Sequence, residues 1–139
     1  MVVRILRLNG LLAAEGEAIA RPAGQTTARW QVLAMVENEP MTVAGIARTL
    51  GLARQSVQRV ADLLADAGLV VYEDNPRHRR ARLVRLTANG RSTLEMIQAS
   101  QAPWANAIGE TVGERELRRA TDVLDRVLAT IRTKGIGRG

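Results

Sequence analysis

Apolar residues recur at helical spacing at the start of the chain. Ile5, Leu8 and Leu12 lie three and four residues apart and predict a helix over about 3–20. The RPAGQ segment at 21–25 ends this helix, because proline and glycine interrupt helical structure. A second helix is predicted in the TTARWQVLAMVENE segment that follows, with these residues facing inward: Trp30, Leu33, and Val36 or Ala34.

The next two helices follow each other closely. Pro40 stops the second helix, and Thr42 is a suitable N-cap for a short helix over about 43–50. Gly51 stands at the position where left-handed glycine closes a helix. A further helix begins near Ala53, and its predicted buried stripe has the spacing i, i+3, i+4, i+7 at Val57, Val60, Ala61 and Leu64.

The sequence then changes from helical to strand composition. Gly68 ends the helix, and the β-forming residues LVVYE at 69–73 and ARLVRL at 81–86 predict two strands. DNPRHRR, between them, is rich in turn-forming residues. This predicts a β-hairpin whose tip is basic.

The remaining residues predict helices to the end of the chain. Thr87 is a suitable N-cap for a long helix running toward Gln101, and Pro103 should kink or restart it. Thr111 and Glu114 have the spacing of a capping box. In the last helix, over about 114–132, a heptad-like spacing is formed by Leu117, Ala120, Leu124, Val127 and Ile131.

The order of these elements predicts a mainly α protein with a small β-hairpin wing. Two helices joined by a short turn that contains glycine form a helix-turn-helix. A hairpin directly after the second helix makes it a winged helix. The stripe over 117–131 fits either a core within the chain or a seam between subunits.

The charge of the chain predicts a polyanionic partner. The net charge is +6 and the isoelectric point about 11.3. Residues 53–91 alone carry eight arginines against four acids, and a clustered basic surface is typical of nucleic-acid binding. Arginine suits both phosphate and guanine edges, because its planar fork donates two parallel hydrogen bonds.

Composition also limits the chemistry. With no cysteine and a single histidine, His78, the chain offers no thiolate or histidine-cluster metal site, and we expect no metal, cofactor or catalytic residue. A small hydrolase would have to pair one of Ser56, Ser92 and Ser100 with His78, without a recognisable motif around the serine. No long uncharged apolar window is present, so we expect a cytoplasmic protein that does not enter a membrane.

Residues 29–90 resemble the MarR family of bacterial transcriptional regulators. The most specific stretch is the wing, NPRHRRARLVRLTANG, which ends in a Leu-Thr-x-x-Gly pattern. His78 stands where the family usually has an aspartate, and Ala53 where it usually has a capping serine or threonine. The resemblance implies one domain over 1–139, with a DNA-binding lobe at 26–90 and dimerisation helices at 3–20 and 88–132.

The candidate DNA contacts lie on the wing and on the helix that begins near Ala53, which is the recognition helix of the helix-turn-helix. Counting 100° per residue, Gln55 and Arg59 point most nearly away from the buried stripe. Arg79 is our first choice for the minor groove, while Arg82 and Arg85 have an alternative in pairing with Asp74 or Glu73. The full set of expected contacts is Arg54, Gln55, Ser56, Gln58, Arg59, Arg77, Arg79, Arg80 and Arg82.

The predicted function is a homodimeric regulator that binds double-stranded DNA at an inverted repeat and acts as a repressor released by a small ligand. The resemblance implies an effector cavity, for which Trp30 and Trp104 are candidates, although aromatics at helical spacing usually belong to a core. The alternative is a winged-helix module for protein contacts or nonspecific nucleic-acid binding.

Overall fold

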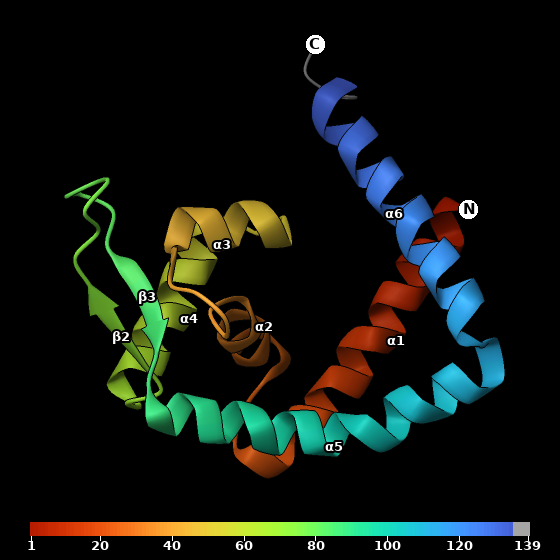
Figure 1. The fold of residues 1–139 in the computed structure, drawn as a ribbon, viewed down its shortest axis with the longest axis horizontal. Helices are drawn as coiled ribbons and strands as arrows, with labels where there is room; N and C mark the ends of the chain where they lie inside the picture. The colour runs from red at the N-terminus through yellow and green to blue at the C-terminus, as the bar shows by residue number, and fades with distance from the viewer. Residues whose placement is uncertain (135–139) are drawn as a thin grey trace. The chain divides into compact units, whose positions relative to one another are not determined.

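The computed structural model of the protein describes residues 1–134, which form a mainly helical chain with one small sheet (Figure 1). Its contacts divide into two compact units, Met1–Gln101 and the residues from Ala102 onward. The elements are α1 (Val2–Ala20), η1 (Arg21–Ala23), α2 (Thr27–Met35), β1 (Met41–Thr42), α3 (Val43–Leu50), α4 (Arg54–Asp66), β2 (Val70–Glu73), β3 (Leu83–Leu86), α5 (Ala88–Val112) and α6 (Glu114–Lys134).

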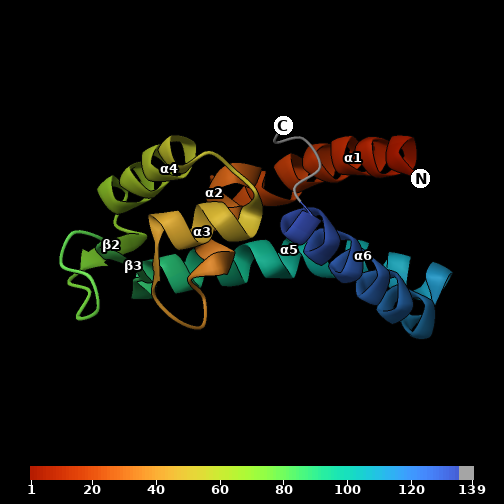
Figure 2. The same cartoon turned by 90° about the horizontal axis from the view of Figure 1, so that it is seen from above.

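The mainly α fold with a β-hairpin wing is confirmed. β2 and β3 pair antiparallel, with Tyr72 opposite Val84, and the tip between them extends away from the helices (Figures 1 and 2). The sequence did not predict β1, whose two residues add a third strand to the other edge of β3. So short a strand carries no periodic signal of its own.

The core of the first unit is aliphatic and lies between α2, α3, α4 and the start of α5. Of the stripe expected on α4, Val57, Ala61 and Leu64 are buried and Val60 is half-buried. Leu33 on α2 and Val36 directly after it are buried, whereas Ala34 is exposed. The completely buried side chains that join these helices include Val32, Leu33, Ile46, Leu64, Leu94 and Ile97.

Short polar side chains fix where the helices begin. Thr42 caps α3 as predicted, because its Oγ1 accepts a hydrogen bond from the N–H of Gly45 at 3.0 Å. Thr87 Oγ1 accepts from the N–H of Gly90 at 3.0 Å and donates to the carbonyl of Gly68 at 2.7 Å. The start of α5 is thereby joined to the turn that precedes the wing.

Of two predictions about the later helices, one is narrowed and one is wrong. α5 continues through Pro103, so a restart there is excluded and a kink stays the prediction. The capping box at Thr111 is wrong, because Thr111 still belongs to α5 and its hydroxyl donates to the carbonyl of Ala107 at 2.8 Å. Gly113, with φ of +89°, is the residue that separates α5 from α6.

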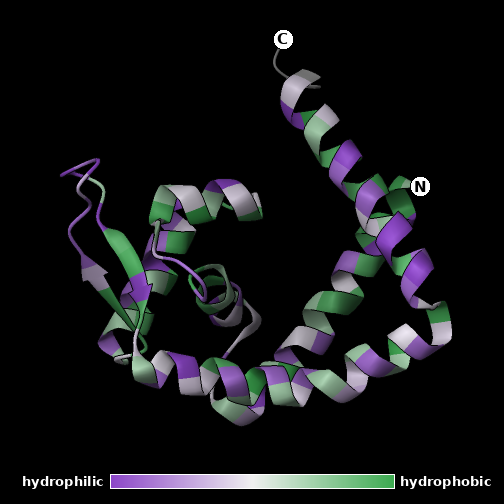
Figure 3. Cartoon of the chain, viewed as in Figure 1, coloured by the Kyte–Doolittle hydropathy of each residue, from purple (hydrophilic) through white to green (hydrophobic). Residues whose placement is uncertain are grey.

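Both the first and the last helix expose apolar side chains. On α1 only Gly16, Ile19 and Ala20 are buried. Its exposed large apolar residues include Val2, Val3, Ile5, Leu6, Leu8, Leu11 and Leu12. Hydrophobic residues recur along the ribbon of α1 (Figure 3). In the second unit, α6 exposes Val123, Leu124, Leu128 and Ile131. None of the helices within residues 1–134 has an apolar stretch long enough to cross a membrane.

Candidate nucleic-acid interface

The exposed face of α4 carries the polar residues that the sequence singled out. Val57 faces the core, which turns the neighbouring side chains to the surface. All five expected α4 contacts are exposed, namely Arg54, Gln55, Ser56, Gln58 and Arg59. Ala53 occupies the N-cap position with extended φ and ψ and gives no side-chain hydrogen bond. The first turn of α4 therefore offers N–H groups that no capping side chain satisfies.

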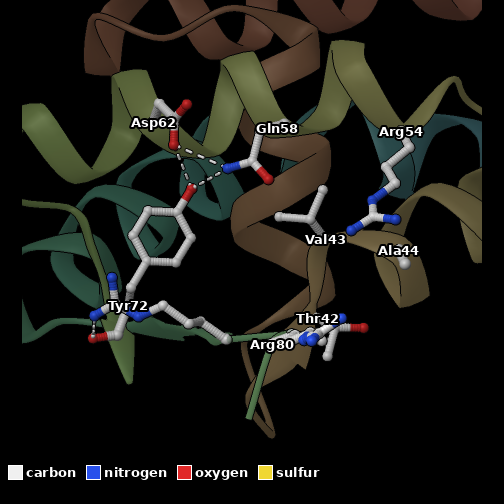
Figure 4. A pocket seen from close by; sticks show the side chains of 10 residues that line it. Thr42, Val43, Ala44, Arg54, Gln58, Asp62, Tyr72 and Arg80 are labelled. Atoms are coloured by element: carbon white, nitrogen blue, oxygen red, sulfur yellow. Dashed lines mark hydrogen bonds between the residues drawn. The ribbon is translucent and has the colours of Figure 1, made fainter. Parts of the chain in front are cut away.

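A groove of about 260 Å³ lies between α4, the start of α3 and the wing (Figure 4). Arg54, Arg80 and Arg82 line it against a single acid, Asp62. The remaining lining residues are Thr42, Val43, Ala44, Gln58, Tyr72 and Ala81. The structure thus brings together arginines from the helix and the wing that are 26 to 28 positions apart in sequence.

Three side chains at one wall of this groove are joined by hydrogen bonds. Gln58 Nε2 donates to Asp62 Oδ1 at 3.0 Å and to Tyr72 Oη at 2.9 Å. Tyr72 Oη in turn donates to Asp62 Oδ1 at 2.6 Å. Because Gln58 and Asp62 lie on α4 and Tyr72 lies on β2, this Gln58–Asp62–Tyr72 cluster fixes the helix against the wing.

The cluster changes the proton affinities of two of its members. The hydrogen bond from Tyr72, helped by the one from Gln58, lowers the pKa of the Asp62 carboxyl, which is therefore ionised at neutral pH. Burial raises the pKa of the Tyr72 hydroxyl, and the neighbouring Asp62 carboxylate raises it further. At neutral pH the phenol is thus a donor and the carboxylate only an acceptor.

The two arginines nearest the strands have different partners. Arg85 pairs with Glu73 across the hairpin, with 2.7 Å between Nε and Oε2, which is one of the alternatives that the sequence left open. Arg82 instead donates from Nη2 to the carbonyl of Tyr72 at 3.3 Å, and its guanidinium lies 5.4 Å from the centre of the Tyr72 ring. Arg82 therefore belongs to the wall of the groove.

The tip of the wing presents a group of exposed arginines. Asn75 shapes the turn, because its Oδ1 accepts from the N–H of Arg77 at 3.0 Å. The side chains of Arg77, Arg79 and Arg80 are exposed and form no ion pair within residues 1–134. The hydropathy colouring marks the tip as strongly hydrophilic (Figure 3).

The other candidate residues lie on α2 and α5, except for His78. Trp30 is half-buried on α2 in the first unit, and Trp104 is half-buried in the part of α5 that belongs to the second unit. His78 lies at the wing tip, whereas Ser92 and Ser100 lie on α5. Within residues 1–134, no three His, Cys, Asp or Glu side chains are grouped so that they could hold a metal ion.

Sequence reasoning identified the arginines and Gln58 but missed the roles of Asp62 and Tyr72. From the sequence, Asp62 is only an acid on the far part of the recognition face. Tyr72 stands out in no pattern, because it is an ordinary β-forming residue in a predicted strand. Its being the chain's single tyrosine, beside a basic wing, is the one available signal.

The fold and this surface define a class, the winged helix-turn-helix transcription regulators. A model of the MarR family matches residues 23–81. The chain is 37% identical over 134 residues to the uncharacterised protein Rv2011c of Mycobacterium tuberculosis, a match that covers 96% of this chain and 94% of that protein. The protein belongs to the MarR family, whose members are transcription regulators rather than enzymes.

Solved structures of the family have the same fold. NadR in complex with 4-hydroxyphenylacetate superposes with a TM-score of 0.82 at 23% identity, covering 90% of this chain and 89% of that one. The Mycobacterium tuberculosis regulator MOSR in complex with DNA gives a TM-score of 0.75 at 22% identity, with coverages of 94% and 97%. At these identities the likeness concerns the fold.

Proposed function

We propose that the protein is a homodimeric regulator that binds double-stranded DNA sequence-specifically and represses transcription until a small ligand releases it. The observation that carries this proposal is the groove at which arginines of α4 and of the wing meet. A solvated charged face on one element would be unremarkable. Convergence of Arg54, Arg80 and Arg82 from two elements favours a polyanion that touches both.

The two elements suit different parts of a duplex. α4 presents Gln55 and Arg59 on its exposed face, and these residue types read adenine and guanine edges in the major groove. Its open first turn favours a phosphate, because the unsatisfied N–H groups carry partial positive charge. The wing tip, with Arg79 foremost, is suited to the adjoining minor groove, where arginine is attracted by the negative potential.

Dimerisation is supported by the apolar side chains that α1 and α6 leave exposed. One face of α6 carries Val123, Leu124 and Ile131, because Ile131 follows Leu124 by seven residues and Val123 by eight, about two helical turns. A surface of this kind is typical of a subunit interface. A two-fold dimer requires an inverted-repeat operator with half-sites about 10 bp apart.

Control by a ligand is supported by the likeness to NadR, whose structure holds 4-hydroxyphenylacetate. For this chain we propose an aromatic or anionic effector and retain Trp30 and Trp104 as candidates for its contacts. Loss of tryptophan fluorescence on adding 4-hydroxyphenylacetate, together with release of bound operator, would support this part of the proposal. Quenching without release would separate binding from regulation.

The central experiment is selection of bound sites from random duplexes, followed by titration of the selected site against random DNA. The expected result is an inverted repeat bound about a thousandfold or more tightly than random sequence. Equal affinity for all duplexes would favour the alternative, a nonspecific nucleic-acid or protein-binding module. Transcription in vitro from a promoter carrying the site then distinguishes repression from activation.

A further inference from the structure

The Gln58–Asp62–Tyr72 cluster determines the orientation of the Gln58 amide, that is, where its oxygen and its nitrogen point. A glutamine amide on a helix surface usually rotates freely, so either its oxygen or its nitrogen can face a ligand. Here Nε2 is 3.0 Å from Asp62 Oδ1 and 2.9 Å from Tyr72 Oη. The nitrogen is therefore directed along α4 toward the wing.

The reverse orientation is unfavourable because Asp62 only accepts hydrogen bonds. Turning the amide over would set Gln58 Oε1 against the Asp62 carboxylate, oxygen against oxygen, and remove both donated bonds. Tyr72 does not relieve this conflict, since its single hydroxyl proton is already donated to Asp62 Oδ1 at 2.6 Å. Asp62 thus selects the nitrogen and Tyr72 holds Asp62 in place.

The amide oxygen is left for an external donor. Within residues 1–134, Gln58 Oε1 accepts no hydrogen bond, and Figure 4 shows it turned away from Asp62 and Tyr72. It points into the groove that Arg54 and Arg80 also line. The two acceptors of Nε2 lie only 2.6 Å apart, so one N–H can serve both. In either arrangement the oxygen stays available.

We propose, building on the proposed DNA-binding function, that Gln58 is a specificity-determining residue that accepts a hydrogen bond from a base amino group in the major groove. Adenine N6 and cytosine N4 are the bases' amino groups there, whereas guanine O6 and thymine O4 are acceptors. The cluster makes Gln58 select adenine or cytosine on one strand and reject guanine or thymine. A freely rotating glutamine would accept both kinds by turning its amide.

The test compares four operators that differ only at the base pair contacted by Gln58. Protection or selection data on the wild type and on Gln58→Leu identify this pair as the one whose preference disappears. Two of these operators, the amino-bearing ones, have adenine or cytosine on the strand that Gln58 contacts; the two keto-bearing ones have guanine or thymine there. Wild-type protein should bind the amino-bearing operators about tenfold more tightly than the keto-bearing ones, which is in the lower range for a base contact. Gln58→Leu should bind all four alike.

The decisive variant is the double change Asp62→Ala with Tyr72→Phe, which leaves Gln58 in place and frees its amide. It should gain affinity for the keto-bearing operators, so that the ratio falls most of the way to parity. Tyr72→Phe alone keeps the ring beneath Arg82 and should relax the ratio in part, which provides a second reading if the double variant folds poorly. Gln31→Ala, which removes an exposed glutamine on α2 outside the interface, is the matched control and should leave the ratio at this base pair unchanged.

The outcomes separate the two proposals. If the double variant and Tyr72→Phe both bind DNA specifically and both keep the tenfold ratio between amino-bearing and keto-bearing operators, the role of the cluster is overturned. The DNA-binding function would still stand. A wild-type preference for a keto base at this pair would do the same. Failure to discriminate any operator from random DNA would overturn the proposed function and this inference together.

Discussion

Tyr72 is the only tyrosine of the chain, and its hydroxyl lies where α4 meets the wing. Its ionisation therefore reports on this junction without interference from another phenol. The partial burial of the ring and the Asp62 carboxylate both oppose formation of a tyrosinate. One side chain thus gives a readout of the cluster that needs no DNA.

A tyrosinate titration followed by absorbance should give a midpoint above the ordinary value of about 10. Asp62→Ala should lower the midpoint toward that value without reaching it, because burial is the larger cause of the raised pKa. Glu73→Ala, which removes an acid from the same strand but outside the cluster, is the control and should change little. A wild-type midpoint at or below about 10 would contradict the hydrogen bonding described for Tyr72.

The same shift in pKa predicts how stability depends on pH. Because the folded state holds the phenolic proton more tightly than the unfolded state, this contribution is complete below a pH of about 10. The free energy of unfolding should fall as the pH rises from there toward the folded-state pKa. Tyr72→Phe should remove that part of the alkaline loss, measured by urea denaturation at several pH values.

The wing arginines should govern the salt dependence of DNA binding. Changing Arg77, Arg79 and Arg80 to Ala should weaken operator and random DNA about equally, since the minor groove offers a degenerate code. The slope of log affinity against log salt should become shallower by about 0.9 for each phosphate that the wing no longer neutralises. Titration of both duplexes at several salt concentrations measures this.

The control for that triple variant removes the same charge elsewhere. Arg115, Arg118 and Arg119 lie exposed on α6, where they pair with Glu114 and Glu116. Changing these three to Ala should leave the salt slope much closer to that of the wild type. Equal effects of the two triple variants would mean that only net charge matters and that the wing makes no local contact with DNA.

At the scale of elements, α4 lacks the capping side chain that α2 and α3 have. Thr26 and Thr42 accept hydrogen bonds from the N–H of Arg29 and Gly45, whereas Ala53 accepts none through its side chain. Ala53→Ser should therefore stabilise the protein by about 0.5–2 kcal/mol, because Ala53 already has the extended backbone of an N-cap residue. Thr42→Ala should destabilise it by a similar amount. Chemical denaturation measures both, and an unchanged midpoint for Ala53→Ser would contradict the absence of a cap.

The close approach of α5 to the turn after α4 depends on Gly90. A Cβ built at this position would lie 1.9 Å from the carbonyl oxygen of Leu69, which is backbone and cannot move aside cheaply. Gly90→Ala should destabilise the first unit by at least about 1–3 kcal/mol. The matched control is Gly109→Ala, also on α5, where an added Cβ would meet nothing within 4 Å. This change should be neutral or stabilising. Equal unfolding midpoints for the two variants would contradict the packing.

Elements with local signals were predictable, and those set by distant partners were not. The helix expected at 43–50 is Val43–Leu50, because Thr42 and Gly51 mark both of its ends. β1 exists only through pairing with β3, some forty residues later, so no pattern in the neighbouring sequence predicts it. The Gln58–Asp62–Tyr72 cluster was likewise hidden, since its members meet only when β2 packs on α4.

At the scale of the whole molecule, the exposed apolar side chains of α6 should join two copies of the chain. Leu124→Asp places a charge on that face and should convert a dimer at micromolar concentration into a monomer, measured by sedimentation. Leu63→Asp is the control, because Leu63 is similarly exposed but lies on α4. A wild-type monomer would contradict the predicted assembly, and a dimer that survives Leu124→Asp would place the interface elsewhere.

The exposed, arginine-rich turn between β2 and β3 also makes the chain easy to cut there. An arginine-specific protease needs an accessible loop, and the wing tip exposes Arg77, Arg79 and Arg80 close together in its turns. One cleavage would separate the chain into two fragments that β2 and β3 still hold together through their antiparallel pairing. Digestion would therefore produce a nicked molecule that keeps its mass in solution and separates only on denaturation, and any polyanion covering the wing would slow the cut.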